Sequence, residues 1–281
     1  MSNNVSQFAT AGIDSLYWGV NDANGYVKGT TGSVAQNAIA GLGRLLGAQS
    51  LGLQIQEPQQ VTILGDDGPI CSFFFAPNQL PSGQLELGVI DLTMAMKAQG
   101  TNVYADGIYD VPVFQPKDFN FASLTLLIAS QAQAEESGNA GNPGFAVSVY
   151  PKITLVPKGP QGYGSAAETK FTHAIVANRS AVWPWGKAQS TANEGTTESA
   201  VWGPVFAENR IMLDTFVLNG TDKTFTLTQT PAADDADHVR IWLNGTELTY
   251  TTDFANTGTA LTLVAAHTAA DIGVVRYEYT K

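Results

Sequence analysis

The residues that could do chemistry in this chain are few and scattered. The histidines are His173, His238 and His267, and none has a metal-binding partner at a spacing such as HExxH. They lie in or beside alternating β segments. We therefore expect strand or surface histidines rather than metal ligands or general bases.

Two glycine-rich stretches match nucleotide-binding loops only in part. GLGRLLG, from Gly41, does not fit GxGxxG, and no βαβ unit surrounds it. KGTTGS, from Lys28, lacks the Lys-Ser/Thr ending of a phosphate loop and follows a hairpin pattern. Both are predicted to be loops or turns, and no cofactor is expected.

The carboxylates do not form a recognisable site either. Asp234, Asp235 and Asp237 do not match the DxDxDG calcium loop, which favours a solvated loop. Glu135 and Glu136 are adjacent, so on a strand they point to opposite faces and cannot flank one bond. No catalytic or metal residue is assigned, and we expect a protein that is not an enzyme.

Aromatic residues offer a binding alternative. Trp183 and Trp185 flank Pro184 beside a polar loop, where they could stack on a sugar or seal a subunit contact. We favour the contact. A carbohydrate-binding module that uses Trp183, Trp185 or Trp242 stays open as an alternative.

The charge composition of the chain limits the classes of partner that are expected. The chain has 281 residues, a net charge of −11 and only 14% charged residues, against about 25% in typical domains. Either much of the surface meets other subunits or the solvated β faces are neutral and polar. The acidic balance, without a basic cluster, argues against a nucleic-acid clamp.

Compartment signals are also sparse. Cys71 is the only cysteine, so no disulfide can form within the chain, and a buried thiol is expected. Neither a signal peptide nor a membrane-spanning apolar run is recognisable, which predicts a protein made and kept in the cytosol.

Alternating patterns predict a mostly-β fold. A hairpin is expected around Asn24-Gly25, strands from Ser50 through ICSFFF, and a short helix in LTMAMKAQG that ends at Gly100. The segment 33–47 is predicted as a short helix or a loop, and FNFASLTLLIASQAQAEESG as a strand. Pro151 should give edge strands or a bent strand. The run 187–199 is predicted to be a mobile loop.

The last part of the chain forms a pattern of its own. Short alternating segments recur at regular spacing, and Leu-Asn-Gly-Thr occurs at 218–221 and at 243–246, each predicted as a hairpin tip. This pattern predicts a small immunoglobulin-like β-sandwich. We expect two domains, 1–212 and 213–281.

The order of these features resembles a known family. YVKGTTG after the first hairpin, GQLELGVIDLTMAMKAQG, VYPKITLVPKG and a C-terminal appendage resemble the major tail tube protein of long-tailed, non-contractile bacteriophages. The last segment, with TFTLTQTP, VRIWLNGTEL and VVRYEYT, is similar to immunoglobulin-like add-on domains of phage virion proteins.

The resemblance implies a fold and a role. A tail-tube-type β-sandwich with a flanking short helix and long loops would assemble into rings of six copies, and the rings would stack into a tube in the virion. Tape-measure and tail-terminus proteins would be partners. DNA would pass without specific binding, because carboxylates repel phosphates. Candidate lumen carboxylates are Asp66, Asp67, Glu86 and Asp91.

The resemblance leaves other roles open. The C-terminal domain would lie outside the tube, as decoration or for weak adhesion to cell-surface glycans. A capsid, baseplate or decoration protein with the same add-on domain is the main alternative within the virion.

Overall fold

The computed structural model describes residues 8–54, 59–65, 68–75, 80–89, 91–99, 102–105, 107, 110–113, 121–134, 143–161, 170–180 and 200–280. Within these residues the chain is strand after strand with a single short helix, which confirms the mostly-β prediction. No described helix has the length and apolarity needed to span a membrane. The segment 187–199 and Gly100 lie outside the described residues.

The largest sheet has eight strands in the order β3-β1-β10-β11-β12-β7-β4, with β13 also paired to β11. Its strands are β1 (Phe8–Val20), β3 (Gly43–Leu45), β4 (Ala48–Gln54), β7 (Ser82–Leu87), β10 (Leu124–Ala134), β11 (Pro143–Gln161), β12 (Lys170–Ala177) and β13 (Trp202–Ala207). Only Leu46 and Gly47 separate β3 from β4, so the two ends of this strand order come together and the sheet must curve around its core. That core contains Leu16, Trp18 and Leu126.

β11 joins the two halves of this sheet. Its first part pairs with β10 on one side and β13 on the other, while its second part pairs with β12. Pro151 lies at the shift of register against β10, where its carbonyl accepts hydrogen bonds from Asn21 and Thr125. The alternative of one bent strand is therefore confirmed, and the expectation of edge strands is wrong. A bulge accommodates the missing proline N–H in a central strand.

The helix α1 (Leu92–Gln99) closes one end of the core, as the sequence predicted. Asp91 caps it, because the backbone N–H of Met94 donates to its carboxylate at 2.9 Å. Met94 and Ala98 are buried against the sheet. By contrast, residues 39–45 form two short strands where a helix or a loop was expected, since both strands find partners far along the chain.

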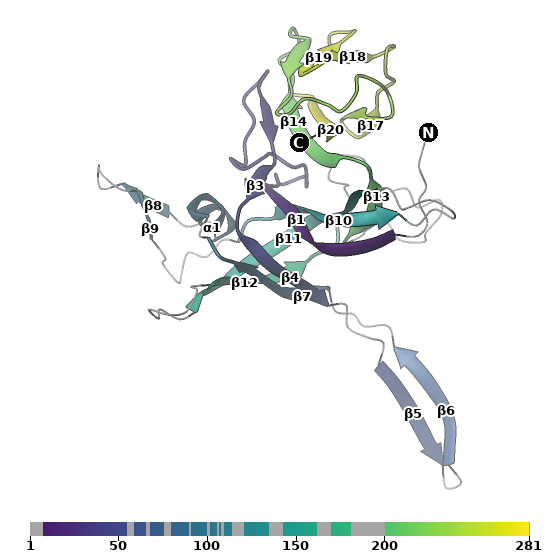
Figure 1. Cartoon of the computed structure of the whole chain (residues 1–281). Helices are drawn as coiled ribbons and strands as arrows, with labels where there is room; N and C mark the ends of the chain where they lie inside the picture. The colour runs from purple at the N-terminus through teal and green to yellow at the C-terminus, as the bar shows by residue number, and fades with distance from the viewer. Residues whose placement is uncertain are drawn as a thin grey trace.

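Two hairpins extend from this body (Figure 1). β5 (Gln59–Gly65) and β6 (Gly68–Phe75) pair only with each other among the described strands, as do β8 (Asn102–Ala105) and β9 (Asp110–Val113). In Figure 1 the β5–β6 hairpin stands well away from the curved sheet, beyond the ends of β4 and β7. ICSFFF is thus a strand, as expected, but it lies in a projecting ribbon.

The C-terminal residues form a second sandwich above the first sheet (Figure 1). One layer has the order β17-β16-β20-β14-β2 and the other β15-β19-β18. Its strands are β2 (Ile39–Gly41), β14 (Arg210–Val217), β15 (Thr224–Thr226), β16 (Val239–Leu243), β17 (Thr246–Glu247), β18 (Phe254–Thr257), β19 (Ala260–Leu263) and β20 (Ile272–Tyr279).

The two Leu-Asn-Gly-Thr copies have different roles. Asn244 and Gly245, both at positive φ, turn β16 into β17, so this copy is the predicted hairpin tip. The other copy carries the chain from β14 in one layer to β15 in the other, and the hairpin prediction is wrong there. The Asn219 side chain accepts hydrogen bonds from the backbone of Thr221 and Asp222, which fixes a turn between layers.

The two sandwiches share one buried cluster. The boundary expected between residues 212 and 213 lies inside β14, and β2, from the N-terminal part, completes the C-terminal sheet. Tyr17 and Leu127 of the first sheet belong to the same buried cluster as Leu213 and Tyr277. The C-terminal sandwich therefore packs against the first sheet through this cluster, while the core around Leu16 and Trp18 is a separate one.

Candidate functional site

The predicted lumen carboxylates do not form a described cluster. Glu86, on β7, accepts a hydrogen bond from the Ser50 hydroxyl at 3.0 Å in an exposed position. Asp91 caps α1 and so has a structural role at the helix start. Asp66 and Asp67 lie outside the described residues, and the lumen assignment remains a prediction.

Of the three candidate tryptophans, only Trp242 lies within the described residues. Trp183 and Trp185 lie outside the described residues. Trp242 is only 3% exposed and packs with Val274, Tyr26 and Trp202, so its ring forms no open platform for a sugar. The guanidinium of Arg276 lies 5.6 Å from the centre of the Trp242 ring.

The joint between the sandwiches is held by an ion pair that the sequence did not indicate. Arg210, at the start of β14, donates to both carboxylate oxygens of Asp14 on β1, at 2.7 and 2.8 Å. Its guanidinium also lies 4.9 Å from the centre of the Phe145 ring. The hydrogen bonds from Arg210 hold the pKa of Asp14 below its usual value, so the pair is ionised at neutral pH.

A cleft of about 790 Å³ opens beside this pair. Asp14, Arg210 and Phe145 line it together with Gln131 and Glu208, and small residues of β1 and β10 form its floor. Its one cation is already engaged by Asp14. The cleft is a groove of mixed polar and apolar lining at the joint, and its described side chains show no nucleophile paired with a base.

A fully buried carboxyl lies inside the C-terminal sandwich. Asp214 Oδ2 accepts hydrogen bonds from the Thr228 backbone N–H at 2.8 Å and from the Tyr277 hydroxyl at 2.9 Å. Its Oδ1 has no hydrogen-bond partner among the described residues and faces Gly41 of β2. Burial raises the pKa of Asp214, and it also raises that of Tyr277.

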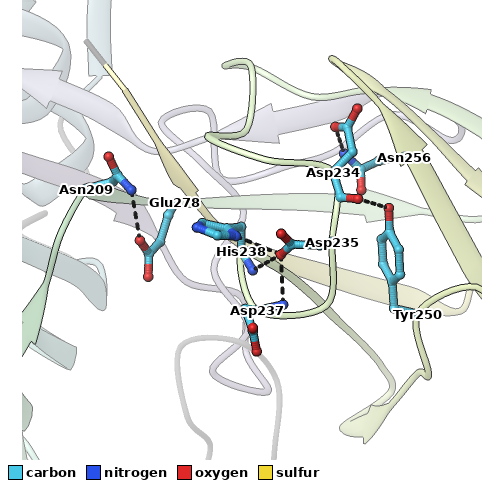
Figure 2. A network of polar contacts seen from close by, with 8 residues as sticks. All are labelled: Asn209, Asp234, Asp235, Asp237, His238, Tyr250, Asn256 and Glu278. Carbon is cyan, nitrogen blue, oxygen red and sulfur yellow. Dashed lines mark hydrogen bonds and ion pairs between the residues drawn. The ribbon is translucent and has the colours of Figure 1, made fainter. Parts of the chain in front are cut away.

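The acidic loop before β16 forms a network of its own (Figure 2). The Asp235 carboxylate accepts hydrogen bonds from the backbone N–H groups of Asp237 and His238 at 3.0 Å, and it lies 2.7 Å from the His238 ring nitrogen Nδ1. Asp234 binds the Asn256 side chain, and its carbonyl accepts from the Tyr250 hydroxyl at 2.6 Å.

This network fixes a turn and shows no reaction centre. An Asp–His pair can activate a nucleophile only when a hydroxyl or thiol lies beside the imidazole. The nearby hydroxyl drawn in Figure 2, that of Tyr250, is engaged by the Asp234 carbonyl. No group of three or more His, Cys, Asp or Glu side chains in the described ranges is arranged to hold a metal ion.

The remaining candidate contact sites are strand edges whose backbone has no partner among the described strands. β4 ends the strand order of the large sheet, and β1 pairs with β3 only at Leu16–Trp18, so residues 8–15 have a described partner on one side only. The β5–β6 hairpin adds a ribbon of two strands with two free edges. Unpaired edges of this length are the usual templates for pairing with another chain.

Comparison with known proteins identifies no relative: no family model, no curated protein and no solved structure matches this chain.

Proposed function

We propose that this chain is a structural subunit that polymerises with copies of itself into a hollow tube, in the manner of the tail tube proteins that its sequence resembles. The observation that carries the proposal is the set of unpaired strand edges on β4, on the first half of β1 and on the β5–β6 hairpin. Soluble monomers usually protect such edges with charges, prolines or covering elements. Contact between identical subunits would remove these edges.

Composition supports self-assembly in a second way. With 14% charged residues, the chain has fewer charges for solvation than a free monomer of its size usually carries. Heterologous contacts between identical copies close into a ring when the rotation between them allows it. A ring of six copies is the number that the family resemblance implies.

The net negative charge of the chain is compatible with a conduit for DNA. A net charge of −11 on each copy would give an assembled tube a strongly negative field. Phosphates would then be repelled from its wall, and DNA would pass without the counterion-releasing contacts that retain it. The C-terminal sandwich would form the outer decoration, and the particle would be a phage virion made in the bacterial cytoplasm.

Sedimentation velocity of the purified chain across a concentration series tests this proposal. We expect large species at high concentration and their loss in Gly52→Lys, which adds a charge to the edge strand β4. A Cβ at Gly52 meets no atom within 4 Å, so this variant should fold normally. A wild-type chain that stays monomeric at every concentration would contradict the proposal.

A further inference from the structure

Three asparagines of this chain stand directly before a glycine: Asn24, Asn219 and Asn244. An Asn-Gly pair can react within itself, because glycine has no side chain to block the approach of its nitrogen to the asparagine amide carbon. The reaction needs no enzyme and no cofactor. In a folded protein it depends on how freely the asparagine side chain can move.

The side chains of Asn219 and Asn244 are held by hydrogen bonds. Asn219 Oδ1 accepts from the Asp222 backbone N–H at 2.9 Å, and its Nδ2 donates to the Asp222 carboxylate at 3.1 Å. Asn244 Nδ2 donates to Asp271 Oδ1 at 2.7 Å, and its Oδ1 accepts from the Ile272 N–H at 3.0 Å. Each of these amides is therefore engaged through both its oxygen and its nitrogen.

The side chain of Asn24 is held by none. Asn24 lies in the exposed turn that follows β1, and within the described residues only its backbone N–H is hydrogen-bonded, to Asp22 Oδ1 at 2.9 Å. The Gly25 nitrogen, which would be the nucleophile, donates to the Asp22 carbonyl at 3.1 Å. That single bond lies in an exposed turn, where local opening requires little free energy. Of the three amides, that of Asn24 is thus the one that can approach its glycine.

We infer that Asn24 is a site of spontaneous deamidation in the folded chain and that Asn219 and Asn244 are protected from it. The Gly25 nitrogen attacks Asn24 Cγ, so that a new C–N bond forms and the Cγ–Nδ2 bond breaks. The amide nitrogen leaves as ammonia and takes the Gly25 N–H proton with it. Water then opens the cyclic imide at either carbonyl, which yields aspartate or isoaspartate. This inference concerns each copy alone and does not depend on self-assembly.

Deamidation would change the turn in which it occurs. Asp22 Oδ1 accepts from the N–H groups of Asn24 and Tyr26, both at 2.9 Å, and a second carboxylate at residue 24 would repel that of Asp22. An isoaspartate also adds a backbone atom before Gly25, which displaces the Tyr26 N–H from its acceptor. Tyr26 packs against Trp242 of the C-terminal sheet. We therefore expect the modified turn to weaken this contact and to lower the melting temperature.

Peptide mapping by mass spectrometry tests the inference on the folded chain incubated for days at mildly alkaline pH. Deamidation at Asn24 should be at least about tenfold faster than at Asn219 or Asn244, because two hydrogen bonds must break before either of those amides can move. In the chain unfolded with guanidinium chloride, the three sites should react at similar rates, since each is an Asn-Gly pair. Labelling with isoaspartyl methyltransferase would identify the isoaspartate product.

Two variants separate protection from local sequence. Asp271→Ala removes the acceptor for Asn244 Nδ2, so Asn244 should deamidate faster in this variant while Asn24 keeps its wild-type rate. Asn24→Ser removes the reactive amide, and its melting temperature should stay constant during the incubation, whereas that of the wild type should fall. Circular dichroism would show that both variants fold.

Equal rates at the three sites of the folded chain would overturn the inference, as would a reaction confined to Asn219 or Asn244. If the unfolded chain reacts while Asn24 of the folded chain stays intact, the turn protects this residue and the inference is wrong. A deamidated wild type that melts at its original temperature would refute the weakening of the contact between Tyr26 and Trp242.

Discussion

At the scale of single residues, the Arg210–Asp14 pair holds the two sandwiches together. Its side chains are 11% and 12% exposed, and the geometry is bidentate, which is the strongest form of a carboxylate–guanidinium contact. Removing one partner of such a buried pair leaves the other charge without compensation. The resulting loss in the free energy of unfolding is far greater than the loss caused by breaking an exposed pair.

Arg210→Ala should therefore lower the free energy of unfolding by about 3 kcal/mol. Arg240→Ala, which breaks the exposed pair with Glu247 at 3.4 Å, should lower it by less than about 1 kcal/mol. Urea unfolding followed by tryptophan fluorescence measures both. Equal losses in the two variants would show that Arg210 does not hold the joint.

Asp214 makes the free energy of unfolding depend on pH, and the direction of its pKa shift fixes the sign of that dependence. Its pKa in the folded chain lies above the value of about 3.9 expected in the unfolded chain. The native state thus keeps a proton that the unfolded state has lost, and the contribution of Asp214 to stability falls as pH rises through the folded pKa. Asp14, with a lowered pKa, acts oppositely: its contribution is lost as pH falls below about 3.9.

We expect Asp214→Asn to remove part of this dependence. As pH falls from 8 toward the unfolded-state value of about 3.9, the wild type should gain stability relative to the variant, as measured by melting temperature at each pH. Glu247→Gln, at an exposed carboxylate, is the control and should follow the wild type. A variant whose pH profile parallels that of the wild type would refute the role given to Asp214.

At the scale of elements, β2 shows how a strand from one part of the chain completes a sheet in another. Gly41 of β2 pairs with Asp214 of β14, and a Cβ there would come within 2.5 Å of Asp214 Oδ1 and 2.6 Å of Thr228 Oγ1. Both neighbours belong to the C-terminal sandwich. The close approach therefore requires glycine at this position.

Gly41→Ala should destabilise the fold by about 1 to 3 kcal/mol, because the methyl group would overpack this contact. Gly52→Ala on β4 is the matched control, since a Cβ there meets nothing within 4 Å, and its effect should stay within about 0.5 kcal/mol. Urea denaturation midpoints measure the difference. Similar midpoints for the two variants would contradict the packing described for β2.

The elements that the sequence predicted correctly are those with strong local patterns. Alternation indicated β4, the helix formers before Gly100 indicated α1, and Asn244-Gly245 indicated its hairpin. The roles of β2 and of Asn219-Gly220 could not be predicted from the neighbouring sequence, because each depends on a partner far along the chain. The same holds for Asp14 and Arg210, which are separated by 196 positions.

The exposure of Leu46 could not be predicted from sequence either. Leu46 follows Leu45 in the same run, yet Leu45 is buried and Leu46 is exposed. Only the turn between β3 and β4 separates their environments. A leucine in an apolar run is normally assigned to the core, and its exposure is visible only once the strands are placed.

At the scale of the whole molecule, we expect the buried cluster that both sandwiches share to make them unfold together. Val27 and Leu42 pack in the same cluster as Phe216 and Val275, and the Thr215 hydroxyl donates to the Val27 carbonyl at 2.6 Å. A decoration domain on a free linker would not share a buried cluster with the neighbouring sheet.

Calorimetry should therefore show a single unfolding transition, with the calorimetric enthalpy equal to the van't Hoff enthalpy. The measurement is best made on dilute protein, so that dissociation of assemblies does not contribute. Two separable transitions, or a stable fragment made of residues 1–209, would show that the sandwiches fold independently.

Self-assembly is the central claim for the whole molecule, and negative-stain electron microscopy of the concentrated protein at neutral pH tests it most directly. The account predicts hollow rings or tubes of uniform width, and their absence in the Gly52→Lys variant. Dispersed monomers at every concentration, or closed shells in place of tubes, would contradict it.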